Sequence, residues 1–266
     1  MPASLATLLD PSPRRCAQAL TLACALLGGL GAQAAEPAPP LPGLLVSYQV
    51  APAQRLALRQ ALRQVVQTRL KTLKTQGVLA DYRVLFSRHA DSDQWDGLVV
   101  LTFTAAAQQA RWAELEREAP AALDPATLAS VVQLHSVPVE LVRRQHAEAP
   151  EPSPVVLAIP YQSLVSAGDY LNYADAYVIP QFQGWMNEGM AAQYAIYASS
   201  FPAGRGWSHL ILVDYRGDEG LAARNATVAK VRARLKEQPT WHAISESKAR
   251  VRDEKAAVVA DDITVR

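Results

Sequence analysis

Tyrosine side chains at helical spacing are the first feature of this sequence that could carry chemistry. Tyr170, Tyr173 and Tyr177 are followed by Phe182 and Trp185 within one segment. An aromatic stripe of this kind could line a ligand pocket, because small-molecule sites are mostly apolar with a few polar groups. The same spacing also describes the buried face of a helix. Core packing is the simpler interpretation of the stripe, and a ligand site is the alternative.

His209 is the second candidate. It lies in an alternating apolar segment, two residues after Trp207 and two before Ile211. Imidazole ligates metals and transfers protons. Because no neighbouring histidine or carboxylate completes a metal-ligand pattern, we favour a structural histidine and expect neither a metal nor a cofactor.

Arginine side chains offer a third kind of chemistry. Arg83 and Arg88 lie on one predicted strand, with Tyr197 on a matching strand later in the chain. These residues could orient an anionic ligand, and solvation of an edge strand explains them equally well.

A basic segment follows the first predicted strand. It contains Arg55, Arg59 and Arg63 at helical spacing and no acidic residue. Such a face suits weak contact with an anionic surface or an acidic partner. A solvated helix face is the simpler interpretation.

Motifs of nucleophilic catalysis are missing from the sequence. It has no GxSxG or HExxH motif and no glycine-rich phosphate loop. Both cysteines, Cys16 and Cys24, lie in an N-terminal segment that we expect to be removed, so the mature chain can form neither disulfides nor thiolate sites. We therefore favour a protein without catalytic activity.

Residues 1–34 have the pattern of a secretory signal peptide. Arg14 and Arg15 precede an uncharged stretch, and Ala-Gln-Ala at 32–34 precedes a proline-rich leader at 35–41. We expect cleavage after Ala34 and a periplasmic or secreted protein. A twin-arginine route and lipoprotein cleavage before Cys24 are the alternatives, and each lacks part of its usual pattern.

The expected mature chain has no net charge. Removing Arg14, Arg15 and Asp10 from totals of 26 basic and 25 acidic residues leaves 24 of each. This balance argues against a general nucleic-acid binder.

An internal repeat organises the remaining chain. A shift of 112 residues aligns residues 77–103 with residues 189–215 without a gap. The identical positions in the first copy are Gly77, Ala80, Tyr82, Ser87, Trp95 and Leu98. The sequence therefore contains two copies of one module, 42–146 and 155–266, joined by a proline-rich linker at 147–154.

The repeat also tests the candidate residues. Most of the aromatic stripe replaces apolar core-type residues of the first copy, but Tyr173 replaces Ala61 and is the least explained by packing. His209 replaces Gly97, so the first copy has no equivalent histidine.

Each copy is predicted to run strand, helix, strand, strand, helix. The first copy has strands at 44–50, 82–89 and 95–103 and helices at 55–74 and 105–118, and Gly77 ends its first helix. The second copy has strands at 155–161, 193–201 and 207–215 and helices at 169–185 and 219–236. We expect a short helix or a closing strand within 123–146, and a return of the tail to the sheet after 242.

Both faces of the third strand are apolar. Alternation places Trp95, Val99, Leu101 and Phe103 on one face and Leu98 and Val100 on the other, and the second copy repeats this. An α+β fold follows, in which two ferredoxin-like modules hide their sheets by packing face to face or closing a shared barrel, with helices outside.

In this arrangement the chain resembles the dimeric α+β barrel superfamily, whose members pair two such modules around a central cavity. The resemblance implies a fused pair here. The superfamily includes cofactor-independent oxygenases, haem-handling enzymes in which a histidine ligates iron, and proteins without known catalysis.

The leading functional hypothesis is non-catalytic binding of a small apolar or aromatic molecule between the modules. Its candidate residues are Arg83, Tyr173, Tyr177, Tyr197, Trp207 and His209. The alternatives are a monooxygenase-like or haem-handling enzyme with Tyr173, Trp207 and His209 near its substrate, and an envelope interaction protein that uses the basic helix.

Overall fold

A computed structural model of the chain describes residues 40–147 and 155–265. The chain divides into two units, Met1–Ala38 and Pro39–Arg266, and only the second is considered below. The predicted signal peptide, most of the proline-rich leader and nearly all of the linker lie outside the described residues. None of the described helices is long and apolar enough to cross a membrane.

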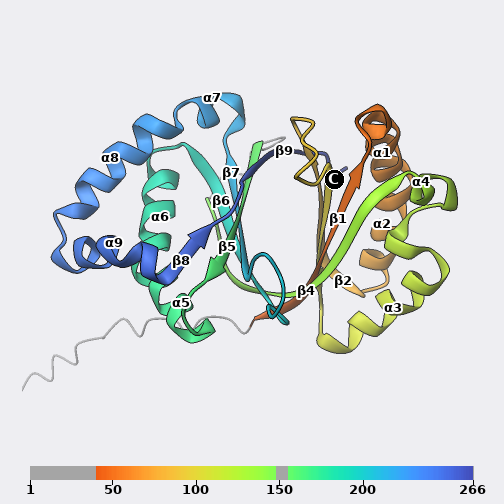
Figure 1. The fold of residues 1–266 in the computed structure, drawn as a ribbon, viewed down its shortest axis with the longest axis horizontal. Coiled ribbons are helices and arrows are strands. Elements are labelled where there is room, and N and C mark those ends of the chain that lie inside the picture. The colour runs from red at the N-terminus through yellow and green to blue at the C-terminus, as the bar shows by residue number, and fades with distance from the viewer. Residues whose placement is uncertain (1–39, 148–154, 266) are drawn as a thin grey trace, which may run out of the picture. The chain divides into compact units, whose positions relative to one another are not determined.

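The first module follows the predicted order of elements (Figure 1). Its strands are β1 (Leu41–Val50), β2 (Leu79–Ser87), β3 (Gly97–Phe103) and β4 (Val131–His146). A long helix between β1 and β2 consists of α1 (Arg55–Ala61), η2 (Leu62–Val66) and α2 (Gln67–Thr75). After β3 come α3 (Gln109–Glu118) and α4 (Pro125–Ala129). The segment 123–146 thus holds both a short helix and a closing strand.

The second module repeats this order. Its strands are β5 (Val155–Ser163), β6 (Ala191–Ser199), β7 (His209–Tyr215), β8 (Arg252–Glu254) and β9 (Val258–Asp262). The helices are α5 (Ala167–Tyr173), η5 (Ala174–Val178), α6 (Ile179–Asn187), α7 (Gly217–Ala222), α8 (Arg224–Lys236) and α9 (Pro239–Val251). The tail returns to the sheet as predicted, since β8 and β9 pair along β5, whereas α9 is an element that the sequence analysis did not predict.

The two modules match in detail. Both long helices contain a π-turn, η2 and η5, at positions 112 residues apart. Both end at a glycine of positive φ, 73° at Gly77 and 74° at Gly189, with the same backbone hydrogen bonds closing the last turn. The repeat therefore extends from sequence to local backbone geometry.

The sheets of the two modules join into one closed barrel. The strand order is β7-β6-β4-β1-β3-β2-β9-β5, and β5 pairs again with β7 to complete the circle. Each module contributes the ferredoxin-like order, and the modules meet where β4 pairs with β6 and where β2 pairs with β9. Helices α1 to α4 cover one outer side and α5 to α9 the other (Figure 1).

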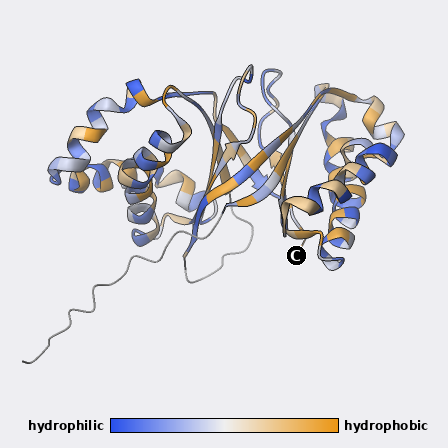
Figure 2. Ribbon diagram, turned by 90° about the horizontal axis from the view of Figure 1, so that it is seen from below, coloured by the Kyte–Doolittle hydropathy of each residue, from blue (hydrophilic) through white to orange (hydrophobic). Residues whose placement is uncertain are grey.

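Apolar side chains fill three layers. One core lies between the first module's helices and its strands, a second lies between the second module's helices and strands, and a third lies inside the barrel. The central strands are hydrophobic over long stretches, whereas the helices carry hydrophilic residues among hydrophobic ones (Figure 2). The prediction that both sheet faces are buried is confirmed.

The predicted direction of two tryptophans is wrong. Trp95 and Trp207 pack against the barrel interior with Leu98 and Val100, whereas Val99 faces the helices. Both tryptophans precede the first residue of their strand, so strict alternation does not extend to them.

Candidate functional site

A cavity of about 730 Å³ opens at one end of the barrel. Its wall is formed by the N-terminal halves of β2 and β6, the C-terminal halves of β3, β4 and β7, the residues around the end of β9, and α2. The other end of the barrel contains Trp95 and Trp207, and aliphatic side chains fill the middle. Space for a ligand therefore exists inside the barrel at its polar end.

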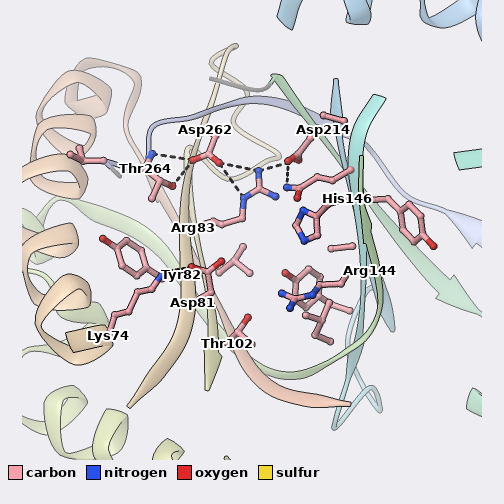
Figure 3. Close-up of a pocket in the computed structure, with 18 of the residues that line it drawn as sticks. Lys74, Asp81, Tyr82, Arg83, Thr102, Arg144, His146, Asp214, Asp262 and Thr264 are labelled. Atoms are coloured by element: carbon pink, nitrogen blue, oxygen red, sulfur yellow. Dashed lines mark hydrogen bonds and ion pairs between the residues drawn. The ribbon is translucent and has the colours of Figure 1, made fainter. Parts of the chain in front are cut away.

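Arg83 is at the centre of this end (Figure 3). Its Nη2 atom lies 3.0 Å from Asp214 Oδ1 and 3.0 Å from Asp262 Oδ2, and its Nε donates to the same Asp262 oxygen. Asp214 also accepts a hydrogen bond from the Gln193 side chain, and Asp262 accepts one from Thr264 N at 3.0 Å. One arginine of the first module is thus bound by two carboxylates of the second.

The environment shifts the pKa values of this group. Burial lowers the pKa of Arg83, but the charges of Asp214 and Asp262 outweigh burial and raise it overall. Burial raises the pKa of Asp214, and the Arg83 charge opposes that rise. Arg83 therefore stays a cation.

Tyr197 lies beside Arg83 on the opposite module. Burial raises the pKa of its hydroxyl to about 12, and the charges of Arg83 and Arg144 act on it in the other direction. The phenol is therefore a neutral hydroxyl at physiological pH, able to donate or accept a hydrogen bond.

Basic side chains surround the opening. Arg144 and His146 project from β4, and Lys74 projects from α2 (Figure 3). Lys71 of α2 also lines the cavity. Lys74 pairs with Asp81 at 2.7 Å. The Arg144 side chain makes no hydrogen bond or ion pair with any residue in the described ranges.

The inner wall is where the two copies of the module differ. At the 112-residue offset Asp81 and Gln193, Arg83 and Ala195, and Thr102 and Asp214 are equivalent, and all six line the cavity. Tyr82 and Tyr194, which also line the cavity but belong to the cores on the helix side of the strands, are identical. Because Ala195 stands where a second arginine would be, the second module has no counterpart of the Arg83 cation at this position.

Two of the six sequence candidates line this cavity, Arg83 and Tyr197. Tyr173, Tyr177 and His209 lie instead in the core between the strands and helices of the second module, where Tyr170, Phe182 and Trp185 also pack. Trp207 packs against the barrel interior at the far end. The structure thus does not bring the six residues into one site.

His209 faces helix α5. Its ring stacks on Tyr170 with centroids 3.8 Å apart, its Nδ1 is 2.9 Å from Ser208 Oγ, and burial lowers its pKa to about 4. Haem does not fit here, since the free ring nitrogen of His209, Nε2, is buried in the core and His209 does not line the cavity. Among the described residues no group of three or more histidines, cysteines or acids could hold a metal ion.

The basic helix is less free than its sequence suggests. Arg55 donates to Asp96 and to the Ser87 carbonyl oxygen, and both Arg55 and Arg59 lie over the Phe86 ring. Of the three arginines proposed to contact an anionic surface, Arg55 is therefore held by its own module.

Several cavity residues were not among the sequence candidates. These are Asp81, Thr102, Arg144, His146, Gln193, Asp214 and Asp262. One signal was present, because Asp214 follows Leu210 and Leu212 at alternating positions and so shares their inward face. An acid on the buried side of an apolar strand needs a partner.

Comparison with known proteins identifies the fold. No family model and no curated protein matches the sequence. A protein from Fusobacterium nucleatum, named as a candidate monooxygenase, matches with a TM-score of 0.51 at 13% identity over 84% of this chain and 93% of that one. An anthrone oxidase-like protein matches with a TM-score of 0.53 at 10% identity over 84% and 91%. The chain has the fold of the dimeric α+β barrel superfamily, with both modules in one polypeptide.

Proposed function

We propose that this is an exported, non-catalytic protein that binds a small organic molecule in the cavity at the polar end of its barrel. The observation that carries the proposal is the cavity itself, about 730 Å³, whose wall combines apolar surface with charged side chains and hydroxyl groups. Divergence of the two modules at this wall supports it, since packing alone would tolerate equivalent residues in both halves.

The ligand class differs from the leading sequence hypothesis. A purely apolar molecule would leave the Nη1 atom of Arg83, the Arg144 guanidinium and the Tyr197 hydroxyl without solvent or partners. A molecule with an apolar body and a polar group matches the lining better.

A cavity-filling variant tests the binding proposal. Ala195→Trp places an indole beside Tyr197, and Ala107→Trp adds the same side chain at an exposed position of the first module. Thermal-shift titrations with 2-naphthoate and 2-naphthamide should raise the Tm of the wild type and of Ala107→Trp and leave Ala195→Trp unmoved. Equal shifts in all three proteins, or none in any, would contradict the proposal.

An oxygenase is the second candidate. It is favoured by the Tyr197 hydroxyl in a cavity of a fold shared with an anthrone oxidase-like protein. Tyr173, Trp207 and His209 would not act in it, because none of them lines the cavity. Oxygen uptake with anthrone that exceeds the rate of Ala195→Trp would favour this candidate over simple binding.

Export rests on the N-terminal sequence, and contact with an anionic surface rests on Arg59 and Arg63. Mass spectrometry of the protein secreted by a bacterial host should give a chain that starts at Ala35. Co-sedimentation with anionic vesicles should weaken on Arg59→Glu and Arg63→Glu if that contact exists.

A further inference from the structure

We infer that the molecule bound in the cavity is an organic anion, a carboxylate on an apolar body, held between Arg83 and Arg144. The inference rests on the proposed function and names its ligand class. The evidence is that some hydrogen-bond donors of the cavity wall are paired with protein acceptors, whereas others have no partner among the described residues.

The Arg83 guanidinium has free donors toward the cavity. Its Nε and Nη2 atoms are used by Asp214 and Asp262, whereas Nη1 has no partner in the described parts of the chain and is not sealed from the cavity. The two carboxylates fix the plane of the guanidinium, so Nη1 is presented in one direction. An oxygen acceptor on a ligand is the partner this group lacks.

Arg144 supplies a second free cation. It projects from β4 into the same cavity as Arg83 (Figure 3). Tyr197 also lines this cavity, and the charges of both arginines act on its phenol. Arginine binds planar oxyanions through paired N–H donors. Two guanidinium groups and a phenol around one space suit a carboxylate.

The carboxylates in the wall do not cancel this attraction. Asp214 and Asp262 are bound by Arg83, Gln193 and Thr264, and Asp81 pairs with Lys74. Among the described residues, four basic side chains (lysines and arginines) and three acidic side chains line the cavity, which leaves it one positive charge. The unbound charges are those of Arg144 and Lys71.

The rest of the wall suits an apolar body. Val100, Leu141 and Ala195 present aliphatic surface, and the Tyr197 ring lies among them. Below them the barrel is filled by side chains, so the ligand is short. A one-ring or two-ring aromatic acid, or an aliphatic acid of similar size, matches this wall.

A matched pair of ligands and a matched pair of variants test the inference. The ligands are 2-naphthoate and its neutral amide, and the variants are Arg144→Gln and Arg143→Gln. These arginines are neighbours on β4, but Arg143 pairs with Asp175 and does not line the cavity. Dissociation constants come from calorimetric titration at pH 7.5, with circular dichroism to show that each variant is folded.

We expect the wild type and Arg143→Gln to bind the acid about tenfold or more tightly than the amide, and Arg144→Gln to lose that preference. Equal binding of acid and amide, both abolished by Ala195→Trp, would overturn the inference and leave the proposed function intact. A preference for the acid that survives in Arg144→Gln would also overturn it. Failure of both ligands to bind would count against the proposed function and the inference together.

Discussion

At the residue scale, His209 illustrates a difference in packing between the two modules. Where one module has a small strand residue beneath a large helix residue, the other has a large strand residue beneath a small helix residue. In the first module a Cβ added to Gly97 would lie 2.6 Å from the Leu62 side chain, so the helix residue fills the space above the strand. At the equivalent positions of the second module, Ala174 leaves that space and His209 fills it. The histidine is therefore explained by packing.

This exchange predicts a compensating pair. His209→Gly alone should lower the free energy of unfolding by about 2–4 kcal/mol, because it empties a packed position. Ala174→Leu alone should also destabilise, since it overfills the space. The double variant should recover at least half of the summed loss in urea unfolding, and strictly additive effects would argue against the exchange.

Burial of His209 also predicts a pH dependence. Its pKa is lowered to about 4 in the folded protein and is about 6.5 when unfolded, so the unfolded state binds the extra proton as the pH falls. The stability that its neutral form contributes is present above pH ~6.5 and is lost toward pH ~4. Between pH 7.5 and 5 the wild type should lose about 2 kcal/mol more than His209→Phe.

The control for this experiment is His89, which is exposed. His89→Gln should follow the wild type at every pH. An identical pH slope in wild type and His209→Phe would show that the imidazole is accessible to solvent.

At the scale of elements, the two glycines that end the long helices should respond alike. Gly77 and Gly189 have φ of 73° and 74°, a region where a Cβ is unfavourable. Alanine at either position should cost about 1 kcal/mol in unfolding free energy. Gly168→Ala inside α5, where an added Cβ meets nothing within 4 Å, should be neutral or stabilising. A neutral Gly189→Ala would contradict the shared helix ending.

The order and approximate bounds of most elements could be predicted, because hydrophobic periodicity and the repeat report on local structure. Helix α9 could not, since its buried face consists of little more than Trp241 and gives a weak periodic signal. The tryptophans before β3 and β7 were misplaced because the start of a strand depends on pairing that local pattern does not contain.

At the scale of the whole molecule, closure of the barrel was predictable and its polar end was not. A sheet with two apolar faces needs a cover on each face. Helices cover one face, and the repeat indicates a second sheet that covers the other. The approach of Arg83 to Asp214 and Asp262, which lie 131 and 179 residues further along the chain, depends on how β2 pairs with β9 across the barrel. No spacing in the sequence encodes that approach.

This ion group joins the modules and should matter to overall stability. Arg83→Met leaves two buried carboxylates without their cation and should cost about 3–5 kcal/mol. Arg143→Met removes a cation from a pair with the half-exposed Asp175 and should cost less than about 1 kcal/mol. Urea unfolding followed by fluorescence and circular dichroism measures both losses. An equal loss of unfolding free energy in the two variants would contradict a buried ion group that joins the modules at Arg83.

The most direct test of a binding cavity at the polar end of a shared barrel is an NMR titration of isotope-labelled protein with 2-naphthoate. We expect the amides that shift to lie around Arg83 and Asp214 on one wall and Arg144 and Tyr197 on the other, contributed by both modules. Shifts confined to Tyr170, Tyr173 and His209 in the second module would place the ligand between sheet and helices and contradict the account.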